Sequence, residues 1–193
     1  GTIIEGEWKD GNMNGHVIIK QSDGTVIEGE FKDGQQHGHG VMKQSDGTVF
    51  EGEWKDNKKN GHGIVKQSNG TRWLRFEGEF KDGKKHGHGI IKQSDGTVYE
   101  GEFRDGKQHG HGIIKQSDGT VIEGEYKDGG QHGTSTVTFV DGTVKEYYYW
   151  HGWDYRYLGI SAVGIIGIGA HLMLKRNLIK ALPSSHFRGL KRL

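Results

Sequence analysis

The sequence has no cysteine, a single proline and few aliphatic residues, and each shortage narrows what the chain can be. Without cysteine, disulfides and cysteine-ligated metal sites are excluded. Hydrophobic residues make up 31% of the 193 residues, which is little for a conventional globular core of this length. The 35 glycines and many charges would suit a disordered chain, but they recur in a regular pattern, which favours a folded repeat.

Charge is divided unevenly along the chain. Seven of the 26 lysines and arginines lie in residues 151–193, where Asp154 is the one acid. This tail therefore carries a net charge of +6, whereas residues 1–150 carry −5. The acidic body argues against nucleic acid as a partner, and the basic tail points to an interface at the C-terminal end.

A unit of about 23 residues is copied six times. The tripeptide Glu-Gly-Glu begins at regular positions, with one spacing of 26 residues among spacings of 23: Glu5, Glu28, Glu51, Glu77, Glu100 and Glu123. Asp-Gly turn signals follow, for example Asp33-Gly34 and Asp82-Gly83, and these tolerate the positive φ angles of tight hairpins. Each unit is therefore predicted to be one β-hairpin that pairs with its neighbours in a long antiparallel sheet.

Alternation along the strands separates two faces. In one unit Tyr99, Gly101 and Phe103 share a face, while Glu100 and Glu102 lie on the other. Glycine where a side chain should pack implies close approach, so the aromatic rings are expected to lie over the glycines beside them. The sheet should then be a ribbon with almost no thick core, in which each unit depends on its neighbours.

The segment Tyr99-Glu-Gly-Glu-Phe-Arg-Asp-Gly-Lys-Gln-His-Gly-His-Gly112 resembles the MORN repeat (membrane occupation and recognition nexus). The same frame recurs at Ile4–Val17, Ile27–Gly40, Phe50–Gly63, Phe76–Gly89 and Ile122–Gly133, with a degenerate seventh start at Asp141. The resemblance implies an all-β repeat ribbon, a single elongated antiparallel sheet over residues 1–146. It implies fold far more specifically than function.

Residues that could take part in catalysis or metal binding recur with the repeat instead of gathering at one place. His-Gly-His occurs at His37, His86 and His109, and two histidines on one strand face could form a metal ladder with the glutamates. A solvated stripe of His–Glu and Lys–Glu pairs explains the same periodicity and is favoured. No nucleophile–base set, phosphate loop or dinucleotide fingerprint is present. The sequence predicts no catalytic, cofactor-binding or metal site, and a protein that is not an enzyme.

One stretch breaks the period. The long spacing contains three extra residues within Arg72, Trp73, Leu74 and Arg75. An insertion here is expected to lengthen a turn or add a bulge. Tryptophan and arginine dominate binding hot spots, so these four residues are candidates for a partner contact. A tolerated loop insertion is the alternative.

The composition changes after Tyr147. Residues 147–156 form an aromatic linker of the kind found at membrane interfaces, and residues 157–174 carry no formal charge over a length of about 27 Å, which suits a transmembrane helix. A helix packed on the end of the ribbon is the alternative. The candidate membrane anchor consists of Trp150, Trp153, Tyr155, Tyr157, Leu158, Ile160, Val163, Ile165, Ile166, Ile168, Leu172 and Leu174.

Residues 175–193 form a basic tail in which Lys175, Arg176 and Lys180 are candidates for contact with lipid headgroups. One short span with a basic flank resembles tail-anchored proteins of the mitochondrial outer membrane, and the charge bias also suits an inner-membrane subunit. A single-pass protein of a mitochondrial membrane is therefore the favoured location.

Three functions remain open. The first is a non-catalytic, membrane-anchored scaffold that serves as an accessory subunit of a larger membrane complex, with other protein subunits and membrane lipids as partners. The second is a module that binds phosphoinositides or other acidic lipids, since lysines such as Lys20, Lys43 and Lys66 recur in register. The third is the regulatory fragment of a larger enzyme.

Overall fold

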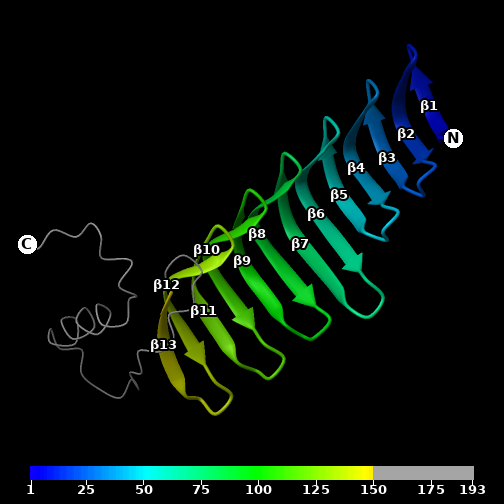
Figure 1. The fold of residues 1–193 in the computed structure, drawn as a ribbon. Coiled ribbons are helices and arrows are strands. Elements are labelled where there is room, and N and C mark those ends of the chain that lie inside the picture. The colour runs from blue at the N-terminus through cyan, green and yellow to red at the C-terminus, as the bar shows by residue number, and fades with distance from the viewer. Residues whose placement is uncertain (150–193) are drawn as a thin grey trace, which may run out of the picture.

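A computed structural model describes residues 1–149 and shows one open antiparallel sheet, in which the order of strands in space follows their order in the sequence (Figure 1). The 13 strands are β1 (Ile3–Lys9), β2 (Asn12–Lys20), β3 (Val26–Lys32), β4 (Gln35–Lys43), β5 (Val49–Lys55), β6 (Lys58–Ser68), β7 (Trp73–Lys81), β8 (Lys84–Gln93), β9 (Val98–Arg104), β10 (Lys107–Lys115), β11 (Val121–Lys127), β12 (Gly130–Thr138) and β13 (Val144–Tyr149). The predicted single sheet of hairpins is confirmed over this part of the chain.

Two kinds of turn alternate along the ribbon. Within each unit a two-residue turn joins the strands, and both of its residues have positive φ, as at Asp105 (51°) and Gly106 (85°). These angles match the twist of the flanking strands. Between units, an aspartate accepts a hydrogen bond from the backbone N–H two residues later, at 2.8 Å from Thr48 to Asp46.

The turn of the third unit is the exception, because Asn57 replaces glycine at a φ of 62°. Its side-chain Oδ1 accepts the N–H of Gln36 at 2.8 Å, and its own N–H donates to the Gln36 carbonyl at 3.1 Å. Asn57→Ala should therefore lower the free energy of unfolding by about 2 kcal/mol, because a buried donor loses its partner and alanine is strained at positive φ. Asn57→Gly relieves the strain alone and should cost about half as much; equal stability of Asn57→Ala and the wild type in urea would contradict this.

Glycines form a row across the middle of the sheet. Each glycine lies opposite another in the neighbouring strand. From β3 to β11 the row is Gly29, Gly40, Gly52, Gly63, Gly78, Gly89, Gly101, Gly112 and Gly124. A Cβ added at Gly89 would lie 2.5 Å from the ring of Phe76, and one added at Gly63 would lie 2.6 Å from the ring of Phe50. The predicted packing of rings over glycines is confirmed.

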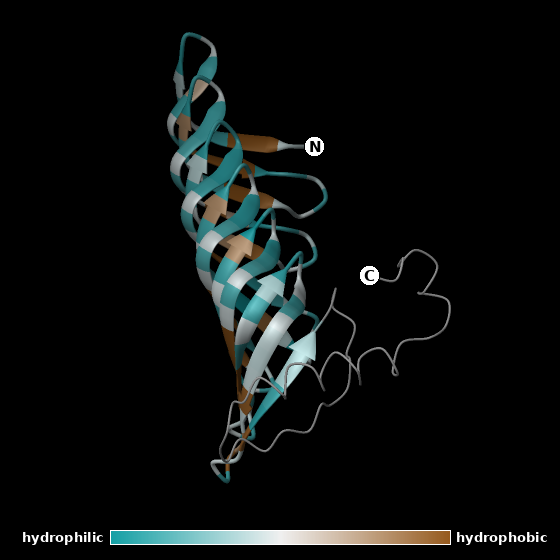
Figure 2. Cartoon of the chain, turned by 90° about the vertical axis from the view of Figure 1, so that its left-hand side faces the viewer, coloured by the Kyte–Doolittle hydropathy of each residue, from teal (hydrophilic) through white to brown (hydrophobic). Residues whose placement is uncertain are grey.

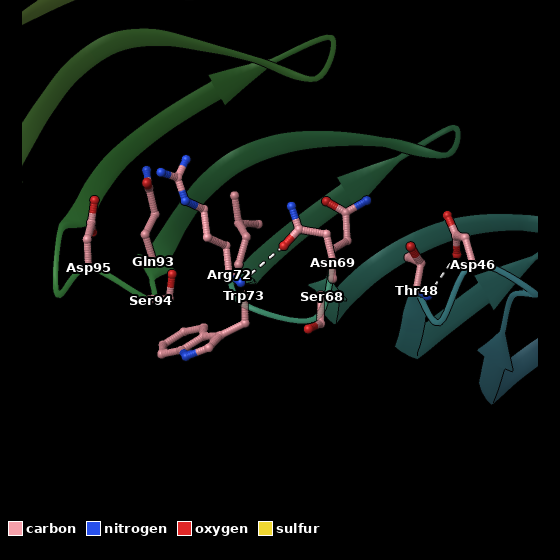
Figure 3. Close-up of a pocket in the computed structure, with 11 residues that line it drawn as sticks. Asp46, Thr48, Ser68, Asn69, Arg72, Trp73, Gln93, Ser94 and Asp95 are labelled. Carbon is pink, nitrogen blue, oxygen red and sulfur yellow. Dashed lines mark hydrogen bonds between the residues drawn. The ribbon is translucent and has the colours of Figure 1, made fainter.

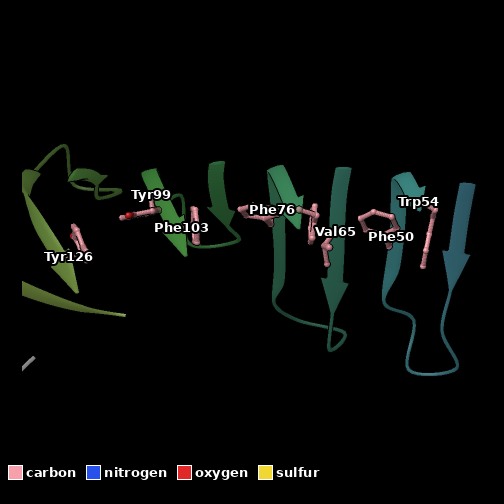
Figure 4. Packing of buried hydrophobic residues seen from close by; sticks show 8 residues of the cluster. Phe50, Trp54, Val65, Phe76, Tyr99, Phe103 and Tyr126 are labelled. Carbon is pink, nitrogen blue, oxygen red and sulfur yellow. The ribbon is translucent and has the colours of Figure 1, made fainter. Parts of the chain in front are cut away.

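The aromatic residues before and after Glu-Gly-Glu form one connected chain of rings along the ribbon (Figure 4). Each ring before Glu-Gly-Glu contacts the ring after it in its own unit and the corresponding ring of the next unit, edge to face, with centroids 5.1–5.4 Å apart. In order the rings are Trp54, Phe50, Phe80, Phe76, Phe103, Tyr99 and Tyr126. The chain of rings ends where Ile27 and Ile122 occupy the position before Glu-Gly-Glu.

The two faces of the sheet differ as the alternation predicts. Tyr99 and Phe103 are buried, whereas Glu100 and Glu102 are exposed. Figure 2 shows short hydrophobic stretches within mostly hydrophilic strands. We call the side with the buried rings the aromatic face and the opposite side the charged face.

Backbone hydrogen bonds also join one unit to the next at the tips. The N–H of Gly83 in one turn donates to the carbonyl of Lys59 in the preceding unit at 2.9 Å, and Gly106 donates likewise to Lys85. Each unit is thus held to its neighbour by ladder bonds, by rings and by a turn contact. This dependence on neighbours is the physical basis of a solenoid.

The C-terminal boundary of the ribbon differs from the prediction. Tyr147, Tyr148 and Tyr149 belong to β13 and pair with residues of β12, so the sheet continues three residues into the expected aromatic linker. The tyrosines suit a strand as well as a membrane interface, which is why composition alone misplaced them. No helix among residues 1–149 is long and apolar enough to cross a membrane, and the predicted helix at 157–174 and the basic tail lie outside the described residues.

Candidate functional site: the Trp73 groove

The three inserted residues lengthen two strands. Beyond the usual last pair, here Lys66 with Arg75, the ladder of β6 and β7 continues with Gln67 opposite Leu74 and Ser68 opposite Trp73. A short turn closes the hairpin, in which Asn69 Oδ1 accepts the N–H of Arg72 at 3.0 Å. The prediction of a longer turn or a bulge is therefore wrong: the added residues satisfy their backbone groups in the ladder.

The lengthened hairpin projects between the turns of its neighbours and creates an open groove of about 640 Å³ (Figure 3). We call this the Trp73 groove, and it is lined by Asp46, Thr48, Gln67, Ser68, Asn69, Arg72, Trp73, Leu74, Gln93, Ser94 and Asp95. Trp73 is 49% exposed, although its backbone carbonyl is held by the N–H of Ser94 at 3.0 Å. A fixed backbone with an exposed indole is a suitable anchor for a partner.

A smaller hollow of about 230 Å³ also borders Trp73 and is lined by Lys66 and Arg75. The guanidinium of Arg75 pairs with the carboxylate of Glu77 at 2.9 Å. In the other units a valine stands at the position of Arg75, as Val49 does between Lys43 and Lys66. The insertion therefore places Arg75 next to Lys66 in the smaller hollow, while Arg72 joins Asp46 and Asp95 in the larger groove.

The four residues predicted from the break in period are brought together. Arg72, Trp73 and Leu74 line the larger groove, and Arg75 lines the smaller hollow beside it. Leu74 also packs against the buried ring cluster and so contributes to the fold. The residues from neighbouring turns, among them Asp46 and Asp95, were not predicted, because they belong to regular units and become special only through the hairpin that projects beside them.

The aspartates in the turns between units should make the stability of the fold depend on pH in the acid range. Hydrogen bonds from the threonines two residues on lower the pKa of Asp46, Asp95, Asp118 and Asp141 below the ordinary value of 3.8. The folded state thus prefers the ionised carboxylates, so their contribution is present above about pH 4 and is lost as pH falls through the lowered pKa values. Asparagine at all four positions keeps a side-chain oxygen that accepts the hydrogen bond but carries no charge. It should therefore flatten the acid limb of a thermal-stability profile, and an unchanged limb would contradict this.

The histidines of residues 1–149 recur along the ribbon with the repeat. Among residues 1–149 no group of three or more histidine or acidic side chains could hold a metal ion. The alternation expected for His109 and His111 is interrupted by a bulge, in which three residues of β10 lie opposite one residue of β9. Gly110, between the two histidines, has a φ of 67°. His111 is exposed and lies 3.1 Å from Glu123, while His109 is half-buried.

Comparison with known proteins identifies the repeat. The family model described as "MORN repeat" matches residues 5–25, 28–49, 50–72, 76–98 and 99–121, which is more than half of the chain. A search of the curated proteins found no match. A solved structure of the wild-type TCP10 domain of Danio rerio CPAP, in complex with a peptide of Danio rerio STIL, matches 77% of this chain and 84% of that chain at 17% identity. Its TM-score is 0.27, so the assignment rests on the repeat.

Proposed function

Because this chain belongs to the MORN-repeat family, we propose that it is a non-catalytic scaffold that docks a partner protein at the Trp73 groove. In the full proposal the scaffold is anchored in a membrane and serves as an accessory subunit of a larger membrane complex, with a mitochondrial complex as the first candidate. The groove offers an indole, a guanidinium and amide and hydroxyl groups, which bind well but supply no activated nucleophile.

The observation that carries the docking role is the coincidence of the insertion with the groove. Six units repeat one pattern, and a groove of about 640 Å³ lies where that pattern is interrupted. Trp54 is buried in a regular unit and so stabilises the fold, whereas Trp73 is exposed in the middle of the sheet. Trp8 is also exposed, but it lies on the edge strand β1. Exposed aromatic residues beside arginine are the side chains that dominate protein interfaces.

The rest of the ribbon suits a rigid spacer. Its 13 strands form one continuous hydrogen-bonded sheet, and the connected rings lock neighbouring units together. At about 4.8 Å per strand, such a sheet extends for about 60 Å. A partner at the Trp73 groove would thus be held at a defined distance from whatever holds the C-terminal end.

The membrane part of the proposal rests on the sequence alone. The uncharged stretch at 157–174 has the length of a membrane span, aromatic residues precede it, and Lys175, Arg176 and Lys180 follow. Extraction of the native membranes with carbonate tests this part: an anchored protein stays in the pellet, whereas release into the supernatant would overturn the anchor.

Docking is tested by purifying the tagged full chain in mild detergent and identifying what accompanies it. We expect a defined set of subunits with the wild type, and at least a tenfold loss of one of them in a Trp73→Ala/Arg72→Ala variant. Trp8→Ala, which removes another exposed indole, is the matched control and should retain the set. Recovery of the wild type as a free monomer, or equal loss in both variants, would contradict docking at the groove.

A lipid-binding role is the second candidate, and one observation favours it. Lys66, Arg75 and Lys92 lie side by side on consecutive strands, where valine otherwise separates the lysines. Vesicles containing phosphatidylserine should then bind an Arg75→Val variant more weakly than the wild type. The surrounding glutamates make this binding weak at physiological salt, and tight binding would move this candidate to first place.

A further inference from the structure

One side-chain position in each unit lies against the aromatic rings. It is the residue opposite the ring that follows Glu-Gly-Glu, as Lys59 is opposite Trp54 and Lys85 is opposite Phe80. Along the ribbon the position is occupied by Met13, Gln36, Lys59, Lys85, Gln108 and Gln131. The two lysines are therefore neighbours, in consecutive units at the middle of the sheet, with uncharged residues on both sides.

The two ammonium groups are packed on rings and not on carboxylates. Lys59 Nζ lies 4.5 Å from the centroid of the Phe50 ring, and Lys85 Nζ lies 4.5 Å from that of Phe76. Neither takes part in an ion pair within residues 1–149, whereas the adjacent and exposed Lys58 pairs with Asp82 at 3.6 Å. Cation–π contacts offset part of the cost of burial but leave the charge uncompensated.

Electrostatics and hydrogen bonding agree with this geometry. Burial lowers the pKa of both lysines, and the charge of Lys59 lowers the pKa of Lys85 further. In the preceding unit Gln36 is 4% exposed, and its Nε2 has no hydrogen-bond partner. This part of the aromatic face therefore holds two half-buried cations and one amide donor without a partner. Such a set of donors suits a site for an acceptor such as a carboxylate.

We propose that Lys59 and Lys85 bind carboxylates of an acidic, extended segment of a partner protein that lies along the aromatic face. Consecutive units are about 9.6 Å apart, since each contains two strands. Carboxylates two or three residues apart in an extended segment are separated by about 7–10 Å, which matches this spacing. One phosphate group is too small to contact both ammonium groups at that separation, which favours a peptide over a single lipid headgroup.

The site is separate from the Trp73 groove. It lies near the two-residue turns within units, such as Asp56-Asn57. Trp73 lies at the opposite ends of the strands, next to the turns between units. Loss of binding at one place therefore does not report on the other.

The test measures binding of a fluorescent peptide of eight glutamates to the full chain in neutral detergent. The variant is Lys59→Gln/Lys85→Gln, because glutamine occupies this position in three other units and so suits the fold. The matched control is Lys58→Gln/Lys84→Gln, which removes the same charge from adjacent exposed positions. We expect the first variant to weaken binding by at least about tenfold and the control by less than about threefold.

Three outcomes of the peptide assay would overturn the proposal. They are no binding of the peptide to the wild type, equal weakening in both variants, and equal binding of a peptide of eight serines. Binding of phosphatidylserine vesicles that depends on Lys59 and Lys85, without binding of the peptide, would also overturn it in favour of a lipid. A melting temperature of Lys59→Gln/Lys85→Gln equal to or above that of the wild type establishes that weaker binding is not unfolding.

Discussion

Phe76→Ala should lower the free energy of unfolding by about 4 kcal/mol, the largest effect that we expect from a single substitution. The Phe76 side chain is fully buried, contacts the rings of Phe80 and Phe103 edge to face, and covers the glycines of its own hairpin. Its removal breaks the chain of rings at the centre and leaves a cavity that the sheet cannot close. In urea or thermal unfolding the melting temperature should fall by about 10 °C.

Trp8→Ala is the control for the loss of a large aromatic side chain. Trp8 occupies the position after Glu-Gly-Glu in the first unit, but it is 55% exposed, since β1 is an edge strand of the sheet that residues 1–149 form. Its replacement should change stability by less than about 1 kcal/mol. Similar losses for Phe76→Ala and Trp8→Ala would show that burial in the chain of rings is not what stabilises the ribbon.

Gly89→Ala should cost about 3 kcal/mol, although it adds a single methyl group. The new Cβ would lie 2.5 Å and 2.7 Å from two ring carbons of Phe76, closer than any real Cβ contact. The ring is held on its other sides by Phe80 and Phe103, so it has little room to move. The φ angle of Gly89 is outside the positive range, so backbone strain makes no contribution.

Glu51→Ala is the matched change on the charged face. Glu51 is exposed on β5, so the substitution should stay within about 0.5 kcal/mol of the wild type. A Gly89→Ala variant as stable as Glu51→Ala would mean that the ring and the glycine do not meet as described.

Local patterns predicted the units of the fold because the decisive residues are close in sequence. The Asp-Gly pairs require positive φ, and alternation around Glu-Gly-Glu places Tyr99 and Phe103 on one face. Because the hairpins repeat at a fixed period, the simplest arrangement is one in which each hairpin pairs with the next. The glycines at the centre of each strand also indicated the rings that cover them.

Features that depend on how the strands pair were not predicted from the sequence. The bulge between Gln108 and Gly112 is a shift in the pairing of β10 with β9, and alternation gives no sign of it. The lengthened ladder at Trp73 depends on a partner strand that can extend equally, which Gln67 and Ser68 provide. Lys59 and Lys85 are 26 residues apart in the sequence, so their meeting on the aromatic face became apparent only from the register.

Ring-over-glycine packing is the contact on which the rigidity of the ribbon, and hence its role as a spacer, depends. If a ring fills the space of a Cβ, then removal of the ring must make that Cβ tolerable. The pair Phe76 and Gly89 isolates this contact, because the next atom near the added Cβ, the carbonyl oxygen of Glu77, is 3.3 Å away.

The most direct test is a double-mutant cycle with Phe76→Ala, Gly89→Ala and the combined variant, followed by urea unfolding. We expect Gly89→Ala to cost about 3 kcal/mol in the wild type and less than about 1 kcal/mol in the Phe76→Ala background, a coupling of about 2 kcal/mol. Additive losses in the combined variant would show that the ring does not cover the glycine and would contradict the packing described for the whole ribbon.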